Sequence, residues 1–274
     1  MLFLLQQAVL VLASGIATYT DLKEGLIHNY ITYPLIAFGL IASFLNGILT
    51  TALLYALIVF VVGYLLYYTG KIGGGDLKLF IGITLIMPEL AGIPFILSVL
   101  VVSSLIALMV VGGYYSIAYL LKGFDYELNE KGIQRIGLLA LFFAGYLYLL
   151  YSFSNISIYS IILLSVVLFF GLMFTALEKG IREFFFLKKI PFKEVELDDL
   201  IAFDYLPASI QKKLDLKGKR VLDEKEVRKI KHLKLKQVPV YRNLPKFGPF
   251  IFIGILLSLA FPEILKLLFL FPGA

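Results

Sequence analysis

Long apolar runs, separated by short polar breaks, make up most of this chain. Runs such as LLYALIVFVVGYLLYY and FILSVLVVSSLIALMVVGGYY are, as helices, each about long enough to cross a hydrocarbon core of roughly 30 Å. Turn-forming residues, among them Asn46-Gly47 and the glycines at 73–75, mark several of the breaks. The pattern predicts membrane-spanning helices near residues 2–19, 30–46, 50–69, 77–90, 94–121, 137–153, 157–177 and 248–270.

Composition supports the same class of protein. Of the 274 residues, 60% are apolar and 16% are charged, and the mean hydropathy is +0.91. Soluble domains carry about 45–50% apolar and about 25% charged residues. We therefore expect an all-α polytopic membrane protein with about eight transmembrane helices.

Residue usage also limits the chemistry. The chain has no cysteine, which excludes disulfides, thiolate nucleophiles and Cys-ligated metal sites. Its two histidines, His28 and His232, lie far apart and outside any ligand-spaced cluster, so we expect no metal and no other cofactor.

The net charge of +6 arises from Lys and Arg beside apolar spans, which favours an anionic lipid bilayer over nucleic acid as partner.

Charge also predicts an orientation. With the N-terminus outside, nearly all Lys and Arg residues face the cytosol, as the positive-inside rule requires of a plasma-membrane protein. The fourth span is the weakest, since its clean apolar stretch from Leu77 to Met87 covers about half a membrane thickness. We interpret it as a crossing helix, because otherwise the charged segment 122–135 would lie outside.

One stretch, residues 178–247, is rich in charge and reads as a small cytosolic α+β domain. Within it, residues 192–204 are predicted to be extended and residues 223–233 to form a helix. The predicted organisation is a membrane domain over 1–177, this domain inserted at 178–247, and a last transmembrane helix within 248–274. The stretch could be a solvated surface, shape a substrate entrance, or bind anionic lipid.

Two carboxylates carry the functional information. Ionisable groups near hydrocarbon are costly and are by default functional candidates. Asp21 closes the first predicted span and Asp76 opens the fourth, so both are expected at the same depth on the cytosolic side. Two carboxylates a few ångströms apart share one proton, so one can activate water while the other polarises a peptide carbonyl. This pair predicts a peptide-hydrolysing site that needs no metal or nucleophilic side chain.

The glycines before Asp76 fit such a site. Gly73, Gly74 and Gly75 lack a Cβ, which lets a substrate backbone approach closely. Their backbone N–H groups and the N-terminus of the following helix would stabilise negative charge at Asp76.

These residues resemble a known family. The segment 73–78 (GGGDLK) resembles the G-x-G-D-x-K motif of type IV prepilin peptidases, most closely the archaeal preflagellin and prepilin peptidases. Asp21, followed by Ile27-His28-Asn29, resembles the other catalytic aspartate of that family followed by I-P-N, with His28 in place of Pro. The segment 245–250 (PKFGPF) resembles a Pro-Phe-Gly-Pro-Phe stretch that leads into the family's last span.

The resemblance implies an aspartic endopeptidase that removes short leader peptides from pilin or archaellin precursors at the cytosolic membrane face. It implies catalysis by Asp21 and Asp76, shaping of the site or substrate binding by Gly73 and Gly75, and supporting roles for Lys78 and Asn29. Bacterial relatives often carry a tetra-cysteine zinc segment and also methylate the new N-terminus. Because this chain has no cysteine, we predict cleavage without N-methylation.

Two other functions stay open at this point. A proton- or cation-coupled transporter could use the two aspartates as ion sites. Transporter sites, however, usually lie near the bilayer midplane on broken helices. A membrane assembly scaffold would tolerate Asp76→Ala, whereas a peptidase would not.

Overall fold

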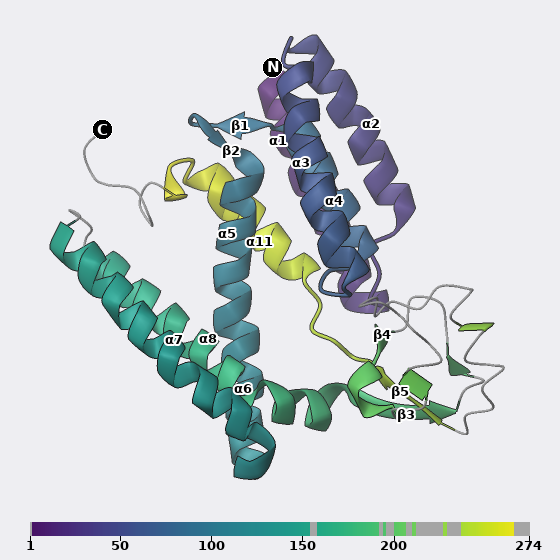
Figure 1. Ribbon diagram of the computed structural model, residues 1–274. Coiled ribbons are helices and arrows are strands. Elements are labelled where there is room, and N and C mark those ends of the chain that lie inside the picture. Colours follow the sequence, from purple (N-terminus) through teal and green to yellow (C-terminus); the bar gives the residue numbers. More distant parts are fainter. Residues whose placement is uncertain are drawn as a thin grey trace.

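A computed structural model describes residues 2–153, 158–191, 194–195, 200–206, 210–211, 227–228 and 237–265. The protein is mostly helical, with a small β region after residue 187 (Figure 1). Its helices are α1 (Leu2–Glu24), α2 (Asn29–Leu45), α3 (Leu49–Tyr68), α4 (Gly74–Ile86), α5 (Phe95–Ala107), α6 (Gly113–Lys122), α7 (Tyr126–Phe153), α8 (Ile158–Ile181) and α11 (Gly248–Ala260). Two π-helical turns, η1 (Leu108–Gly112) and η2 (Arg182–Phe186), and a 3-10 turn, η4 (Phe203–Tyr205), interrupt or follow them.

Five helical segments of the described chain are long and apolar enough to cross a membrane, which confirms a polytopic membrane protein. They are Leu2–Glu24, Leu49–Tyr68, Phe95–Lys122, Tyr126–Ser152 and Ser160–Phe186. The third of these runs through α5, η1 and α6 without a break. Helices α2 and α11 are also apolar but shorter, as is α4 with 13 residues. Helices therefore occur at all eight predicted places, while only five have the length of a full span.

Helix α4 differs most from the expectation. It ends at Ile86, short of the predicted residue 90, and the chain then forms a hairpin of β1 (Glu89–Leu90) and β2 (Ile93–Pro94). Positions all around it are buried, and it contacts α1, α2, α3 and α5. A short helix that is apolar on every side is suited to a protein core rather than to lipid.

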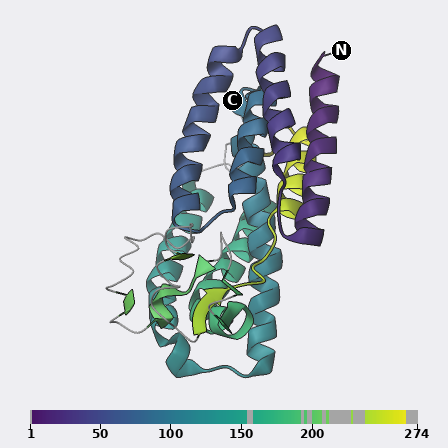
Figure 2. The ribbon, with the colours of Figure 1, turned by 90° about the vertical axis from the view of Figure 1, so that its right-hand side faces the viewer.

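The core around α4 joins the first helices to the last one. Its fully buried side chains include Leu10 of α1, Ile83 of α4, Phe95 of α5 and Ile251 of α11. Helix α11 crosses behind α5 in the view of Figure 1 and runs beside α1 in Figure 2, and it contacts both helices. The beginning and end of the chain are therefore packed together although they are far apart in sequence.

A second helical group contains α6, α7 and α8. Buried Asn129 of α7 links all three, since its side-chain amide donates to Tyr119 Oη at 2.9 Å and its carbonyl accepts the Gly180 N–H at 3.1 Å. Helix α7 begins at Tyr126, well before the predicted span start at residue 137. The Asp125 carboxylate accepts the Leu128 N–H at 3.0 Å, which caps this earlier start.

The β region lies at one end of the second helical group. Its three strands are β3 (Leu187–Pro191), β4 (Leu200–Ile201) and β5 (Gln237–Tyr241), antiparallel in the order β3-β5-β4. Buried Ile190, Ile201 and Val240 form its core. Strand β4 lies within the predicted extended segment 192–204, of which residues 192–193 and 196–199 fall outside the described residues. Most of the predicted helix 223–233 also falls outside them. The domain boundary at 177 stays a prediction, and α8 continues past it to Ile181.

Candidate active site

Asp21 lies near the C-terminal end of α1 and is buried, with 7% of its surface exposed. One of its carboxylate oxygens, Oδ2, accepts the backbone N–H of Gly248, the first residue of α11, at 2.9 Å. Thr18, one turn earlier in α1, donates its hydroxyl to the Gly248 carbonyl at 2.9 Å. A Cβ at Gly248 would lie 2.8 Å from Asp21 Oδ2, so only glycine allows this contact. The start of α11 therefore fixes the orientation of the Asp21 carboxylate.

Asp76 lies in the first turn of α4 and is half-buried. Its Oδ2 accepts the backbone N–H of Gly73, the residue that precedes the helix, at 3.2 Å. An acidic side chain that folds back onto the N-cap amide satisfies a donor that has no partner within the helix. The glycine run thus holds the Asp76 carboxylate at the helix N-terminus.

The structure brings the two aspartates together. Asp21 is one of the charges that act on the Asp76 carboxyl group, so the two side chains are close enough to interact electrostatically. They come from the end of α1 and the start of α4, which contact each other in the bundle. This is the juxtaposition that their positions in the sequence predicted.

Gly75 sets the approach of α4 to the loop that follows α1. A Cβ at Gly75 would lie 2.8 Å from both the Cβ and the carbonyl oxygen of Ile27. That loop begins at Gly25, which has a φ of +74° and donates its N–H to the Asp21 carbonyl at 2.8 Å. The positive φ turns the chain sharply out of α1, and the missing Cβ at Gly75 lets α4 lie against it.

Lys78 and Asn29 form a contact between α4 and α2. Lys78 Nζ donates to Asn29 Oδ1 at 2.6 Å and lies 5.3 Å from the centre of the Tyr33 ring. This contact links the start of α4 to the start of α2, and the supporting role expected of both residues stays a prediction.

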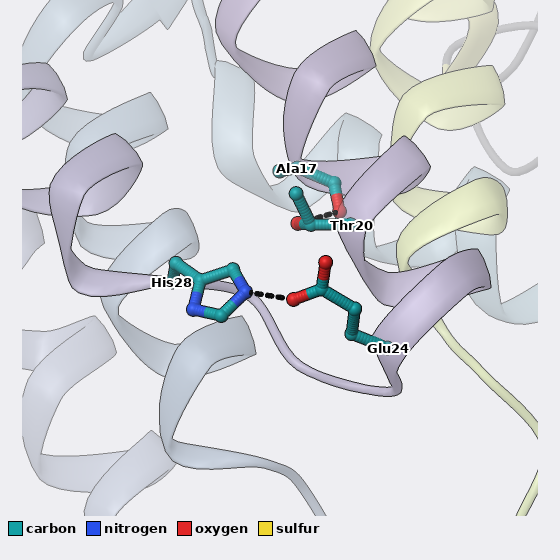
Figure 3. Close-up of polar contacts among 4 residues, drawn as sticks. All are labelled: Ala17, Thr20, Glu24 and His28. Atoms are coloured by element: carbon teal, nitrogen blue, oxygen red, sulfur yellow. Dashed lines mark hydrogen bonds and ion pairs between the residues drawn. The ribbon is translucent and has the colours of Figure 1, made fainter.

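His28 stands where the resembling family has proline, and its backbone keeps the conformation that a proline would impose. Its φ of -76° lies within the range to which the proline ring restricts φ. Its ring contacts the Glu24 carboxylate at 2.5 Å (Figure 3) and stacks on Tyr30 with 5.0 Å between ring centres. Figure 3 also shows Thr20 donating to the Ala17 carbonyl within the last turns of α1. The replacement therefore preserves the path of the chain from α1 to α2.

Two residues of the site received no role from the sequence. Gly248 binds Asp21, and Lys246 donates its Nζ to the Leu22 carbonyl at 2.5 Å while its charge acts on Asp21. The sequence signal that could have pointed to Gly248 is the Gly-Pro pair at the start of the last helix, where a residue without a side chain precedes a proline. Within the part of the chain that the structure describes, no group of three or more His, Asp or Glu residues gathers into a possible metal site.

Comparison with known proteins gives the class. Residues 8–112 match the model of the type IV leader peptidase family. The matched part carries both aspartates, and the match agrees with the resemblance drawn from the glycine-aspartate motif. Over 92 residues the chain is 33% identical to a protein named prepilin peptidase EppA from the archaeon Methanothermobacter thermautotrophicus.

That alignment covers 31% of this chain and 24% of the relative, so the chain spans about a quarter of the length of the curated protein it matches. No solved structure matches the chain.

Proposed function

We propose that this chain is a membrane aspartyl endopeptidase that removes short leader peptides from prepilin-like or archaellin-like precursors. Asp21 and Asp76 are its catalytic residues. The observation that carries this proposal is that the two carboxylates, from the end of α1 and the start of α4, lie close enough to interact electrostatically. The family match over the same segment supports it.

In the proposed mechanism, the two carboxyl groups share one proton and titrate as a pair. The ionised aspartate takes a proton from a water molecule, whose oxygen attacks the scissile carbonyl carbon. The protonated aspartate donates a hydrogen bond to the carbonyl oxygen. The aspartate that took the proton from water then gives it to the leaving amine as the C–N bond breaks. Each aspartate uses its Oδ2 to accept a backbone N–H, from Gly248 or from Gly73, which keeps the pair oriented for this work.

The membrane arrangement follows from the charge pattern. We place the N-terminus outside and the dyad at the cytosolic face of the plasma membrane, with α2, α4 and α11 completing an eight-helix arrangement. The precursor's own hydrophobic helix would lie in the bilayer, so that the junction between leader and helix reaches the two aspartates. Cleavage leaves a free, unmethylated N-terminal amine on the mature protein.

The decisive test is cleavage of a tagged prepilin-like precursor by the full chain reconstituted in lipid vesicles. Asp21→Asn and Asp76→Asn keep the shape of the side chain but remove the acid, so each should lower kcat roughly 10²- to 10⁴-fold. Asp204→Asn, at an exposed aspartate of the β region, is the matched control and should cleave like wild type.

Mass spectrometry of the product locates the cut and shows whether the new amine is methylated. Normal cleavage by either aspartate variant would refute the catalytic assignment. Failure of the folded wild type on a panel of precursors, together with proton or cation flux, would favour the transporter instead.

A further inference from the structure

An apolar cavity of about 160 Å³ is lined in part by the segment that directly precedes Gly248, the residue whose N–H binds Asp21. One wall comes from the end of α5 and from η1, including Ala107 and Val111, and Phe174 of α8 forms a second. The third wall is the chain that enters α11, with Phe247 and Phe250. The cavity is large enough for an apolar side chain, and its walls are side chains that favour one.

The cavity adjoins the candidate active site through a few residues of backbone. Phe247 lines the cavity and directly precedes Gly248, whose N–H binds Asp21. Lys246 also lines it and donates to the carbonyl of Leu22, the residue after Asp21. An extended chain advances about 3.3 Å per residue. A substrate bound at the dyad can therefore reach this cavity with the residues next to its scissile bond.

The wall from α5 has an unusual shape. The helix winds as a π-helix at η1, which widens its backbone at the cavity, and Leu108, Val111 and Gly112 of this turn are all lining residues. Single π-helical turns within α-helices occur frequently at functional sites. The wide turn is thus a second feature that marks this place, independent of the nearby aspartates.

Charge decides which part of a precursor fits. Among the described residues that line the cavity, Lys246 is the only charged one. A basic leader residue would meet this like charge and would lose its hydration against apolar walls. We propose that the cavity binds an apolar side chain from the first residues of the precursor's hydrophobic helix, immediately after the scissile bond. This assignment rests on the proposed peptidase function and makes Ala107, Val111 and Phe174 determinants of specificity.

The test uses precursors that differ by Leu→Ala at one position, covering the first four residues after the scissile bond and the last two of the leader. Wild type should lose roughly tenfold or more in kcat/KM at one position after the bond, because a single methylene missing from a hydrophobic pocket costs roughly 10- to 200-fold. Ala107→Phe fills the cavity and should abolish that preference. Val110→Phe is the matched control, since Val110 is 54% exposed and lies in the same turn, so it should keep the preference.

A second variant guards against misfolding. Phe174→Ala enlarges the cavity and should shift the preference at the same position from Leu toward the larger Phe. If wild type cleaves but shows its preference only in the leader, or if Ala107→Phe and Phe174→Ala both keep the wild-type preference, the cavity is not the binding site. If wild type cleaves none of the precursors, it is the proposed peptidase function that fails, which is a different result.

Discussion

Gly75→Ala tests whether the fit of α4 against the loop after α1 sets the geometry of the dyad. The added Cβ would lie 2.8 Å from the Ile27 carbonyl oxygen, about 0.6 Å inside ordinary van der Waals contact, which begins at 3.4 Å. The clash is with backbone as well as side chain, so it cannot be relieved by a rotamer change. The start of α4, and Asp76 with it, has to move away from the loop.

The expected cost follows from that displacement. A misplacement of about 1 Å in an active site can cost roughly 10²-fold in rate, so a shift of this size should lower kcat about ten- to a hundredfold. The measurement is kcat at saturating substrate, with a precursor that wild type cleaves. KM should change much less, because the substrate contacts themselves remain.

Gly74→Ala provides the matched control within the same glycine run. Its Cβ would lie 3.4 Å from the Tyr67 ring, which is ordinary contact with a side chain. Gly74→Ala should therefore retain most of the wild-type activity. Equal rates for Gly75→Ala and wild type, or an equal loss in both variants, would refute the reasoning that the Ile27 contact positions Asp76.

Two further changes probe the surroundings. Lys246→Met removes the hydrogen bond to the Leu22 carbonyl and a charge that acts on Asp21, so kcat/KM should fall by up to about tenfold, with Lys246→Arg recovering most of it. In the β region, burial and the hydrogen bond to Glu183 raise the pKa of Tyr205 above its usual 10.0. The neutral phenol is therefore favoured in the folded state, and its contribution is complete at neutral pH and lost as the pH rises above 10. Tyr205→Phe should cost about 1 kcal/mol in thermal unfolding at pH 7 and less at pH 11, and a pH-independent difference would contradict this.

The sequence located the helices and the two aspartates because those features are written in local patterns. Apolar runs predicted helices at all eight observed places, and the positions of Asp21 and Asp76 at span ends predicted that they would lie together. Hydropathy could not show that α4 is a buried core helix, since an apolar residue facing protein and one facing lipid look alike in a sequence. It also missed the early start of α7, where charged residues form regular helical turns.

The contacts that orient the two aspartates could not be predicted from local sequence patterns, because they join distant parts of the chain. Gly248 and Asp21 are 227 positions apart, and their bond depends on how the last helix packs against the first. Nothing in the sequence around Lys246 indicates that its amine meets the carbonyl of Leu22. Such contacts are determined by tertiary packing, so they became visible only in the folded arrangement.

The charged stretch before α11 influences the site through the path of its backbone. Strand β5 leads into Arg242, whose N–H donates to the Phe186 carbonyl at 3.0 Å and whose guanidinium donates to the Glu194 carbonyl at 2.8 Å. Asn243 follows with a φ of +59°, a left-handed conformation that asparagine tolerates better than most residues and that turns the chain toward α11. From there only a short segment leads to Gly248 and its bond to Asp21. The contacts of Arg242 with the β region therefore set where the segment that leads to Gly248 begins.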